Sequence, residues 1–143
     1  MGTSYETDVV AWALEQAALL RAGELSAIDI EHIAEEIEDV ARSEQRELID
    51  RIVKLQTKLL DWQFLPGRRC RSKKRIINAE RLHIAYVLKG SQSLKAKIAA
   101  PDCAQLMWKK AVAEITNATG LDVFSETCPW SVEQALDDGF LPD

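Results

Sequence analysis

Apolar residues recur at intervals of three or four along a stretch that holds no glycine or proline between Asp29 and Pro66. At about 100° per residue, these side chains fall on one side of a helix. They are Ile33, Ile37, Val40, Ala41, Leu48, Ile52, Leu55, Leu59 and Trp62. The polar side chains outside this stripe are His32, Glu35, Glu38, Asp39, Glu47 and Asp50. The pattern predicts one long helix over about 30–64 with Asp29 as its N-cap, buried along the stripe and solvated on the opposite side.

A first helix is expected ahead of the long one. Thr3 and Glu6 have the spacing of a capping box before an apolar run. The run predicts a helix over about 5–22, and Gly23 should end it.

A short turn at residues 65–67, Leu-Pro-Gly, should fold the chain back on itself. A third helix, antiparallel to the long one, should therefore begin within 67–75 and run to about Lys89. Further elements are expected as a short helical turn after Ser91 or Ser93, a fourth helix from Pro101 to near Gly120, and a short last helix capped by Ser131 and Gln134 in a loop-rich tail. No stretch indicates a strand, so the predicted fold class is all-α: a single-domain helical bundle over residues 1–143.

Length and composition are those of a globular domain. The chain has 143 residues, of which 47% are apolar and 29% charged, and it is long enough to bury a core. No apolar run approaches the roughly 20 residues that cross a bilayer, and the N-terminus lacks a signal-peptide pattern. The three cysteines, Cys70, Cys103 and Cys128, form no CxxC pair. We expect a cytoplasmic protein with free thiols and no membrane association.

Charge is distributed unevenly along the chain, whose formal net charge is −5. Residues 1–66 carry a net charge of −8, residues 67–99 a net charge of +9, and residues 100–143 a net charge of −6. A basic middle between acidic ends favours either an anionic partner or contact with the acidic parts of the same chain or of a second copy.

A line of charge also lies inside the apolar stripe. Glu44, Arg51 and Lys58 are seven residues apart, and positions in heptad register drift by only about 20° per repeat, so all three should face the core or its edge. Glu80 falls among the apolar positions of the third helix, followed by Arg81. Because buried charges need partners, these five residues predict a polar layer between the two helices.

Within this layer, the antiparallel register places Arg51 level with Glu80, so Arg51 is the expected partner and Lys58 the second choice. Removal of one member of a buried pair costs about 3–5 kcal/mol, because the other charge is left unpaired. The sequence leaves open whether the layer is a structural ion-pair network or part of an enzymatic or ligand-binding site.

A second candidate is the basic segment at residues 67–75, an anion-binding candidate. Its bases are Arg68, Arg69, Arg71, Lys73, Lys74 and Arg75. Basic clusters supply phosphate contacts, but no aromatic residue within the segment offers a stacking platform, and the chain as a whole is acidic. We expect a solvated helix start, or contact with the acidic long helix, ahead of nucleic-acid binding.

The sequence does not match the ligand patterns of known metal and cofactor sites. The carboxylate pairs Glu35/Glu38 and Glu47/Asp50 share one helix and lie roughly 18 Å apart, so they cannot hold one ion. The pair at positions 29 and 32 resembles a di-iron ligand pair, but Asp29 is needed as a cap. With two histidines and no clustered cysteines, we expect no metal and no cofactor.

Several runs, in order, resemble one bacterial family, catalogued as domain of unknown function 29 and common in cyanobacteria and proteobacteria. They are YETDVVAWALEQAALLRAG, IDIEHIAEEIEDVARSEQREL, LLDWQFLPGRR, SQSL and TCPWSVEQALDDGFLP. The resemblance spans about residues 5–142. It implies an all-helical bundle and carries no established activity.

The chain departs from the family pattern at five positions. Members often have histidine at the position of Lys58, a basic residue at Asp61, and Trp, Thr and Gln at Lys73, Ile76 and Glu80. The matching residues include Glu35, Glu36, Ser43, Trp62 and Arg81. A Lys–Glu pair in place of His–Gln suggests a compensated contact across the bundle. If relatives use that histidine for chemistry, this member lacks it.

These patterns favour a non-enzymatic protein-interaction module that self-associates, as a dimer. Ile49, Val53 and Leu60 lie opposite the main stripe and make the late part of the long helix apolar on two sides, which one small bundle should not cover. The alternatives are an enzyme or ligand-binding bundle that uses the polar layer, and an anion-binding protein that uses the basic segment.

Overall fold

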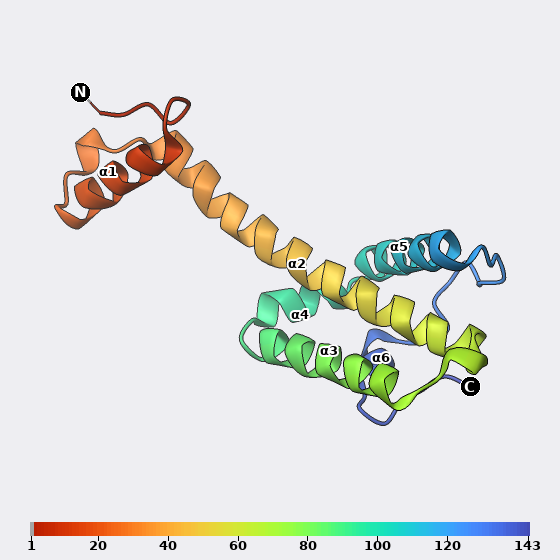
Figure 1. The fold of residues 1–143 in the computed structure, drawn as a ribbon. Helices are drawn as coiled ribbons and strands as arrows, with labels where there is room; N and C mark the ends of the chain where they lie inside the picture. Colours follow the sequence, from red (N-terminus) through yellow and green to blue (C-terminus); the bar gives the residue numbers. More distant parts are fainter. Residues whose placement is uncertain (1) are drawn as a thin grey trace. The chain divides into compact units, whose positions relative to one another are not determined.

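The computed structural model describes residues 2–143, and the regular structure within that range is all helical (Figure 1). The elements are α1 (Val9–Arg21), η1 (Leu25–Ala27), α2 (Ile30–Phe64), η2 (Pro66–Arg68), α3 (Arg71–Lys89), α4 (Gln92–Ala99), α5 (Pro101–Thr119) and α6 (Val132–Leu136). The predicted all-α fold class and the predicted long helix over 30–64 are confirmed.

The chain divides into two compact units between Glu44 and Gln45, inside α2. The N-terminal unit, residues 2–44, contains α1, η1 and the beginning of α2. The C-terminal unit, residues 45–143, contains the rest of α2 and all later helices. The single domain expected over residues 1–143 stays a prediction, because two compact units of one chain can still fold as one domain.

Capping residues explain most helix ends. Asp8, in extended conformation, accepts a hydrogen bond from the Ala11 amide at 3.1 Å and caps α1. The predicted start of this helix at about residue 5, capped by Thr3, was therefore wrong. Gly23, at a φ of 74°, lies beyond the end of α1, as expected. The other boundary residues lie where predicted: Ser91 caps α4, Pro101 begins α5, Gly120 follows α5 at a φ of 76°, and Ser131 caps α6.

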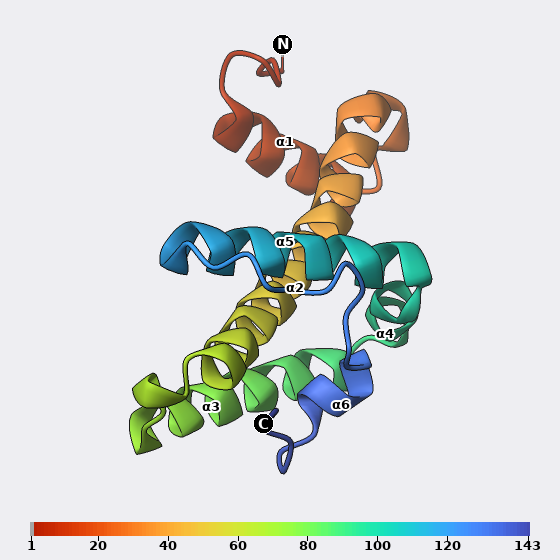
Figure 2. The same ribbon diagram turned by 90° about the vertical axis from the view of Figure 1, so that its right-hand side faces the viewer.

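The C-terminal unit has one hydrophobic core, built from the second half of α2 together with α3, α4, α5 and the tail. The antiparallel arrangement of α2 and α3 is confirmed, since Asp61 contacts Lys73 near the turn and Arg51 contacts Glu80 farther from it. On the other side of α2, Thr57 contacts Glu114 of α5. The short α6 lies beside α3 (Figure 2).

The late part of α2 is covered within the chain. Val53 and Leu60 are buried in the same cluster as Met107 and Ile115 of α5, and Ile49 packs against that cluster. The sequence-based reason for a dimer, that this end would be left uncovered, was therefore wrong, because α5 covers it.

The N-terminal unit reverses the predicted faces of the long helix. Ile37 and Val40, predicted to be buried in the stripe, are 66% and 64% exposed. Conversely, His32, predicted to be on the wet face, is half-buried against Tyr5 and Trp12. The segment before α1 and α1 itself pack against the polar side of the start of α2. Tyr5 donates a hydrogen bond to Glu36 of α2, and Trp12 donates one to Asp29, the residue before that helix.

Candidate functional site

The polar layer predicted between α2 and α3 is present in part. Arg51 Nη1 lies 3.9 Å from Glu80 Oε2, which confirms the predicted pair at the long end of salt-bridge range. Arg51 also contacts Glu47, at 3.5 Å. Glu80 Oε2 is buried without a hydrogen-bond partner among the described residues. This pair joins α2 to α3.

Two members of the predicted layer lie elsewhere. Glu44 is exposed, although its heptad position was expected to face the core. Arg81 is buried, at 1% exposure, and the predicted place for it in the layer was wrong. Its side chain turns to the C-terminal tail, because a helix presents successive residues about 100° apart and Arg81 therefore leaves the side on which Glu80 lies.

The Arg81 guanidinium holds the C-terminal tail against α3 through hydrogen bonds. It donates hydrogen bonds to the carbonyl oxygens of Ala135 at 2.8 Å, Asp138 at 3.4 Å and Phe140 at 2.5 Å, and to the side chain of Asn78. Desolvation lowers the pKa of Arg81, while the neighbouring aspartates of the tail oppose that shift. These contacts give Arg81 a structural role.

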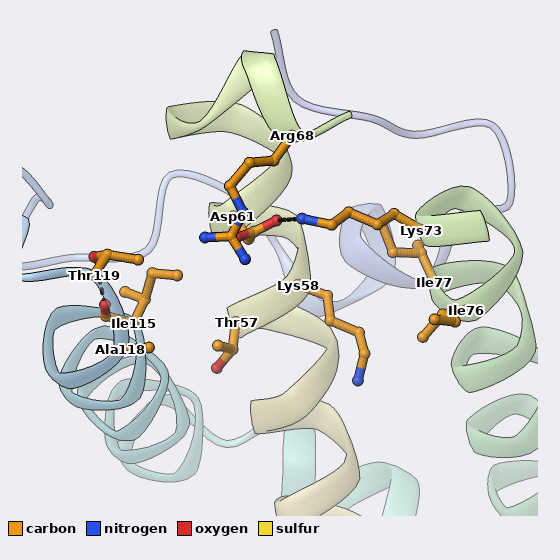
Figure 3. A pocket seen from close by; sticks show the side chains of 10 residues that line it. All are labelled: Thr57, Lys58, Asp61, Arg68, Lys73, Ile76, Ile77, Ile115, Ala118 and Thr119. Atoms are coloured by element: carbon orange, nitrogen blue, oxygen red, sulfur yellow. Dashed lines mark hydrogen bonds and ion pairs between the residues drawn. The ribbon is translucent and has the colours of Figure 1, made fainter. Parts of the chain in front are cut away.

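Lys58, in contrast, lines a cavity of about 320 Å³ bounded by α2, α3, α5 and the η2 turn (Figure 3). Its walls combine four aliphatic residues with six polar or charged ones. The lining residues are Thr57, Lys58, Asp61, Arg68, Lys73, Ile76, Ile77, Ile115, Ala118 and Thr119. Cavities of this size and composition are typical of small-molecule sites.

Asp61 organises the charges of the cavity. Its carboxylate forms salt bridges with Lys73 Nζ at 2.5 Å and with Arg68 Nη1 at 3.3 Å. Two cations that follow α2 in the sequence therefore contact one acidic residue of that helix. Figure 3 shows Asp61 between these two side chains, with Lys58 extending from α2 toward α3. Lys58 forms no salt bridge or hydrogen bond with any described residue, and the expected Lys58–Glu80 contact is not among those found.

The rest of the basic segment is largely engaged with the end of α2. Arg69 donates to the carbonyl oxygen of Trp62 at 2.8 Å and lies over its ring, 5.3 Å from the centroid. Lys74 lies over the same ring, at 5.7 Å. Arg71 and Arg75 remain exposed. The segment thus contacts the long helix, as one of the two favoured interpretations expected, and most of its bases are occupied.

Four of the five positions at which the resemblance implied a departure from the family pattern meet at the cavity: Lys58, Asp61, Lys73 and Ile76. Sequence reasoning placed Lys58 in a helix–helix layer and assigned Asp61 no role. A signal was available, since Lys58 and Asp61 are three residues apart and so share one face of the helix that leads into a basic turn. No feature of the sequence indicated that α5 would form one wall of the cavity.

Within residues 2–143, no three His, Cys, Asp or Glu side chains gather as they would around a metal ion. None of the helices described is both long enough and apolar enough to cross a membrane.

The fold and the site therefore define an all-helical protein with a cationic cavity in its larger unit. The chain belongs to the family described as Domain of unknown function DUF29, whose sequence model matches residues 4–141. No curated protein and no solved structure shows significant similarity to it.

Proposed function

We propose that the chain is a non-enzymatic protein-interaction module that binds a second copy of itself through the N-terminal unit. The observation that carries this proposal is the imbalance of apolar burial in that unit. Trp12 is its one buried hydrophobic side chain among the residues described, whereas eight large hydrophobic side chains are exposed. They are Val9, Val10, Leu14, Leu20, Leu25, Ile30, Ile37 and Val40. Units of about 40 residues usually need oligomerisation, a metal or disulfides to be stable.

Apolar residues at the start of α2 form an ordered row, of which Ile33 is half-buried and the others are exposed. Ile30, Ile33, Ile37 and Val40 alternate at spacings of three and four, the spacing with which one helix packs along another. Ile30, Ile37 and Val40 are each about two-thirds exposed. Burying three such side chains would contribute about 1.5–3 kcal/mol each before the costs of association.

Charge supports a particular surface on the second copy as the binding partner. Residues 2–44 carry eleven acidic and two basic side chains, a net charge of −9. Two N-terminal units placed face to face would therefore repel each other. Residues 67–99, which include α3, carry a net charge of +9. The apolar row of α2, which lies in an acidic unit, is therefore complementary to an apolar surface that carries basic residues.

The outer side of α3 provides such a surface. Leu82 and Tyr86 are 74% and 80% exposed and line a shallow groove together with His83 and Lys89. Arg75 lies on the same side of α3 two helical turns before Leu82 and is also exposed. The proposed interface joins the α2 row of one copy to this α3 groove of the other copy.

The test is light scattering after size exclusion. The wild-type chain should elute with about twice its 16.1 kDa mass, and the dimer should weaken with salt because the surfaces are oppositely charged. Ile37→Glu and Leu82→Glu should each give monomers, whereas Val123→Glu, at an exposed apolar position that belongs to neither proposed surface, should not. A monomeric wild-type protein at high concentration would overturn the proposal.

A mixing experiment identifies the pair of surfaces. The Ile37→Glu variant keeps an intact α3 groove, and the Leu82→Glu variant keeps an intact α2 row. Mixed together, they should form a heterodimer through one undamaged interface. Dimerisation of the Leu82→Glu variant by itself would instead show that two N-terminal units bind each other.

A further inference from the structure

The cavity in the C-terminal unit combines an apolar interior with an excess of positive charge. Ile76 and Ile77 line it from α3, and Ile115 and Ala118 line it from α5 (Figure 3). Its volume, about 320 Å³, lies at the lower end of the range for small-molecule sites. The walls suit an aliphatic or aromatic body of modest size.

Charge in the cavity is unbalanced. Three cations, Lys58, Arg68 and Lys73, line it together with one carboxylate, Asp61. Asp61 contacts both Arg68 and Lys73, so its own charge is already shared between them. Lys58 is half-buried and has no anionic partner among the described residues. A partly desolvated ammonium gains a strong, charge-assisted hydrogen bond when an anion approaches it.

We propose that this cavity binds a small organic anion, with its carboxylate or phosphate head on Lys58 and its apolar body between α3 and α5. Arg68 and Lys73, held in place by Asp61, contribute positive potential to the head. Thr57 and Thr119 are the polar side chains on the α5 side of the cavity. The Thr119 hydroxyl already donates to the Ile115 carbonyl at 2.6 Å, which leaves that wall poor in free donors and suited to the apolar body.

Four eight-carbon probes test the class of ligand by isothermal titration calorimetry at low salt. Octanoate and octyl phosphate should bind, and comparison of the two identifies the preferred head. Octanol should bind at least tenfold more weakly, because it lacks the charge, and octylamine should not bind. Failure of both anions to bind, or binding of octanol as tight as that of octanoate, would overturn the proposal.

Matched variants test the site. Lys58→Met keeps the length of the side chain and removes its charge, and it should weaken octanoate binding at least tenfold. Lys54→Met removes an exposed charge one turn earlier on the same helix and should leave binding unchanged. Equal affinity of the Lys58→Met and wild-type proteins would contradict the assignment of the head to Lys58.

A third variant tests the position of the apolar body. Ala118→Trp should fill the cavity without altering its charge and should abolish binding, and the melting temperature shows whether that variant is folded. The Ile37→Glu variant, which is designed to disrupt the dimer, should bind octanoate like the wild type. Ligand binding and self-association are thereby tested independently.

Discussion

Tyr5 stacks on His32, with ring centroids 4.2 Å apart and ring planes inclined by 15°. The Tyr5 hydroxyl donates to Glu36 at 2.5 Å, and Nδ1 of His32 lies 2.7 Å from Asp29 Oδ2. The same Asp29 oxygen accepts the indole N–H of Trp12 at 3.0 Å. These polar and aromatic contacts hold the segment before α1, α1 and the start of α2 together in a unit that has little hydrophobic core.

The cluster makes the N-terminal unit sensitive to pH. The hydrogen bond to Asp29 raises the pKa of His32 above 6.5, and the same bond lowers the pKa of Asp29 below 3.8. The stabilisation from His32 is complete below pH 6.5 and is lost as the pH rises through its raised pKa. The stabilisation from Asp29 is complete above pH 3.8 and is lost as the pH falls through the lowered pKa of Asp29. We expect the unit to be most stable between these two values.

The protection of the Trp12 indole N–H from hydrogen exchange measures this dependence directly. Hydrogen bonding to Glu36 raises the pKa of Tyr5 to about 12, so the tyrosine stays a donor throughout the range of interest. Protection should fall above neutral pH in the wild type. His32→Gln should remove that change near neutrality and keep the change at acid pH. Wild-type protection that stays constant from pH 6 to pH 9 would contradict the assignment.

Arg81 is predicted to be the most sensitive charged residue of the C-terminal unit. Arg81→Met should lower the free energy of unfolding by about 2–4 kcal/mol, because the carbonyl groups of the tail lose their charged donor. Arg81→Lys should recover little of the lost free energy of unfolding, since one ammonium group cannot replace the several donors of a planar guanidinium group. Urea unfolding measures both changes. An Arg81→Lys variant as stable as the wild type would show that charge alone suffices.

Most of the fold follows from local sequence. The bounds of α2 and α5 depend on Pro66, Pro101 and Gly120, whose effects on the backbone need no tertiary information. The exposed row at Ile37 and Val40 could not be predicted, because periodicity shows that a helix has an apolar face but not which neighbour covers it.

The candidate site was predictable only in part. Register along an antiparallel pair placed Arg51 opposite Glu80, since α2 ends and α3 begins at one short turn. The cavity needs α5, whose placement depends on contacts between residues far apart in sequence, such as Thr57 with Glu114. Lys58 was therefore recognised as a charge on the inner side of α2, but its neighbours were not.

The three cysteines should differ sharply in reactivity. Cys70 is exposed, and the Ser72 hydroxyl 3.1 Å away lowers its pKa, whereas burial raises the pKa of Cys103 and Cys128. Because the thiolate is the nucleophile, iodoacetamide at neutral pH should label one site quickly. Intact-mass spectrometry over time would show a single fast addition that Cys70→Ser removes. Three additions at one rate would contradict this ranking.

The last prediction concerns the Arg51–Glu80 pair, whose predicted contact is confirmed but is weaker than the sequence implied. The side chains are 31% and 20% exposed, and 3.9 Å is too long for a hydrogen bond. The 3–5 kcal/mol expected for a fully buried pair therefore does not apply.

We expect Glu80→Ala to lower the free energy of unfolding by about 1 kcal/mol. Glu80→Gln should cost less, because the unpaired oxygen of Glu80 loses its charge. The matched control is Glu38→Ala, which removes a 68% exposed carboxylate 3.5 Å from Arg42 on the same long helix and should change stability little. Thermal and urea unfolding of the three variants decide the matter: equal effects of Glu80→Ala and Glu38→Ala would show that the pair contributes no more than a surface contact.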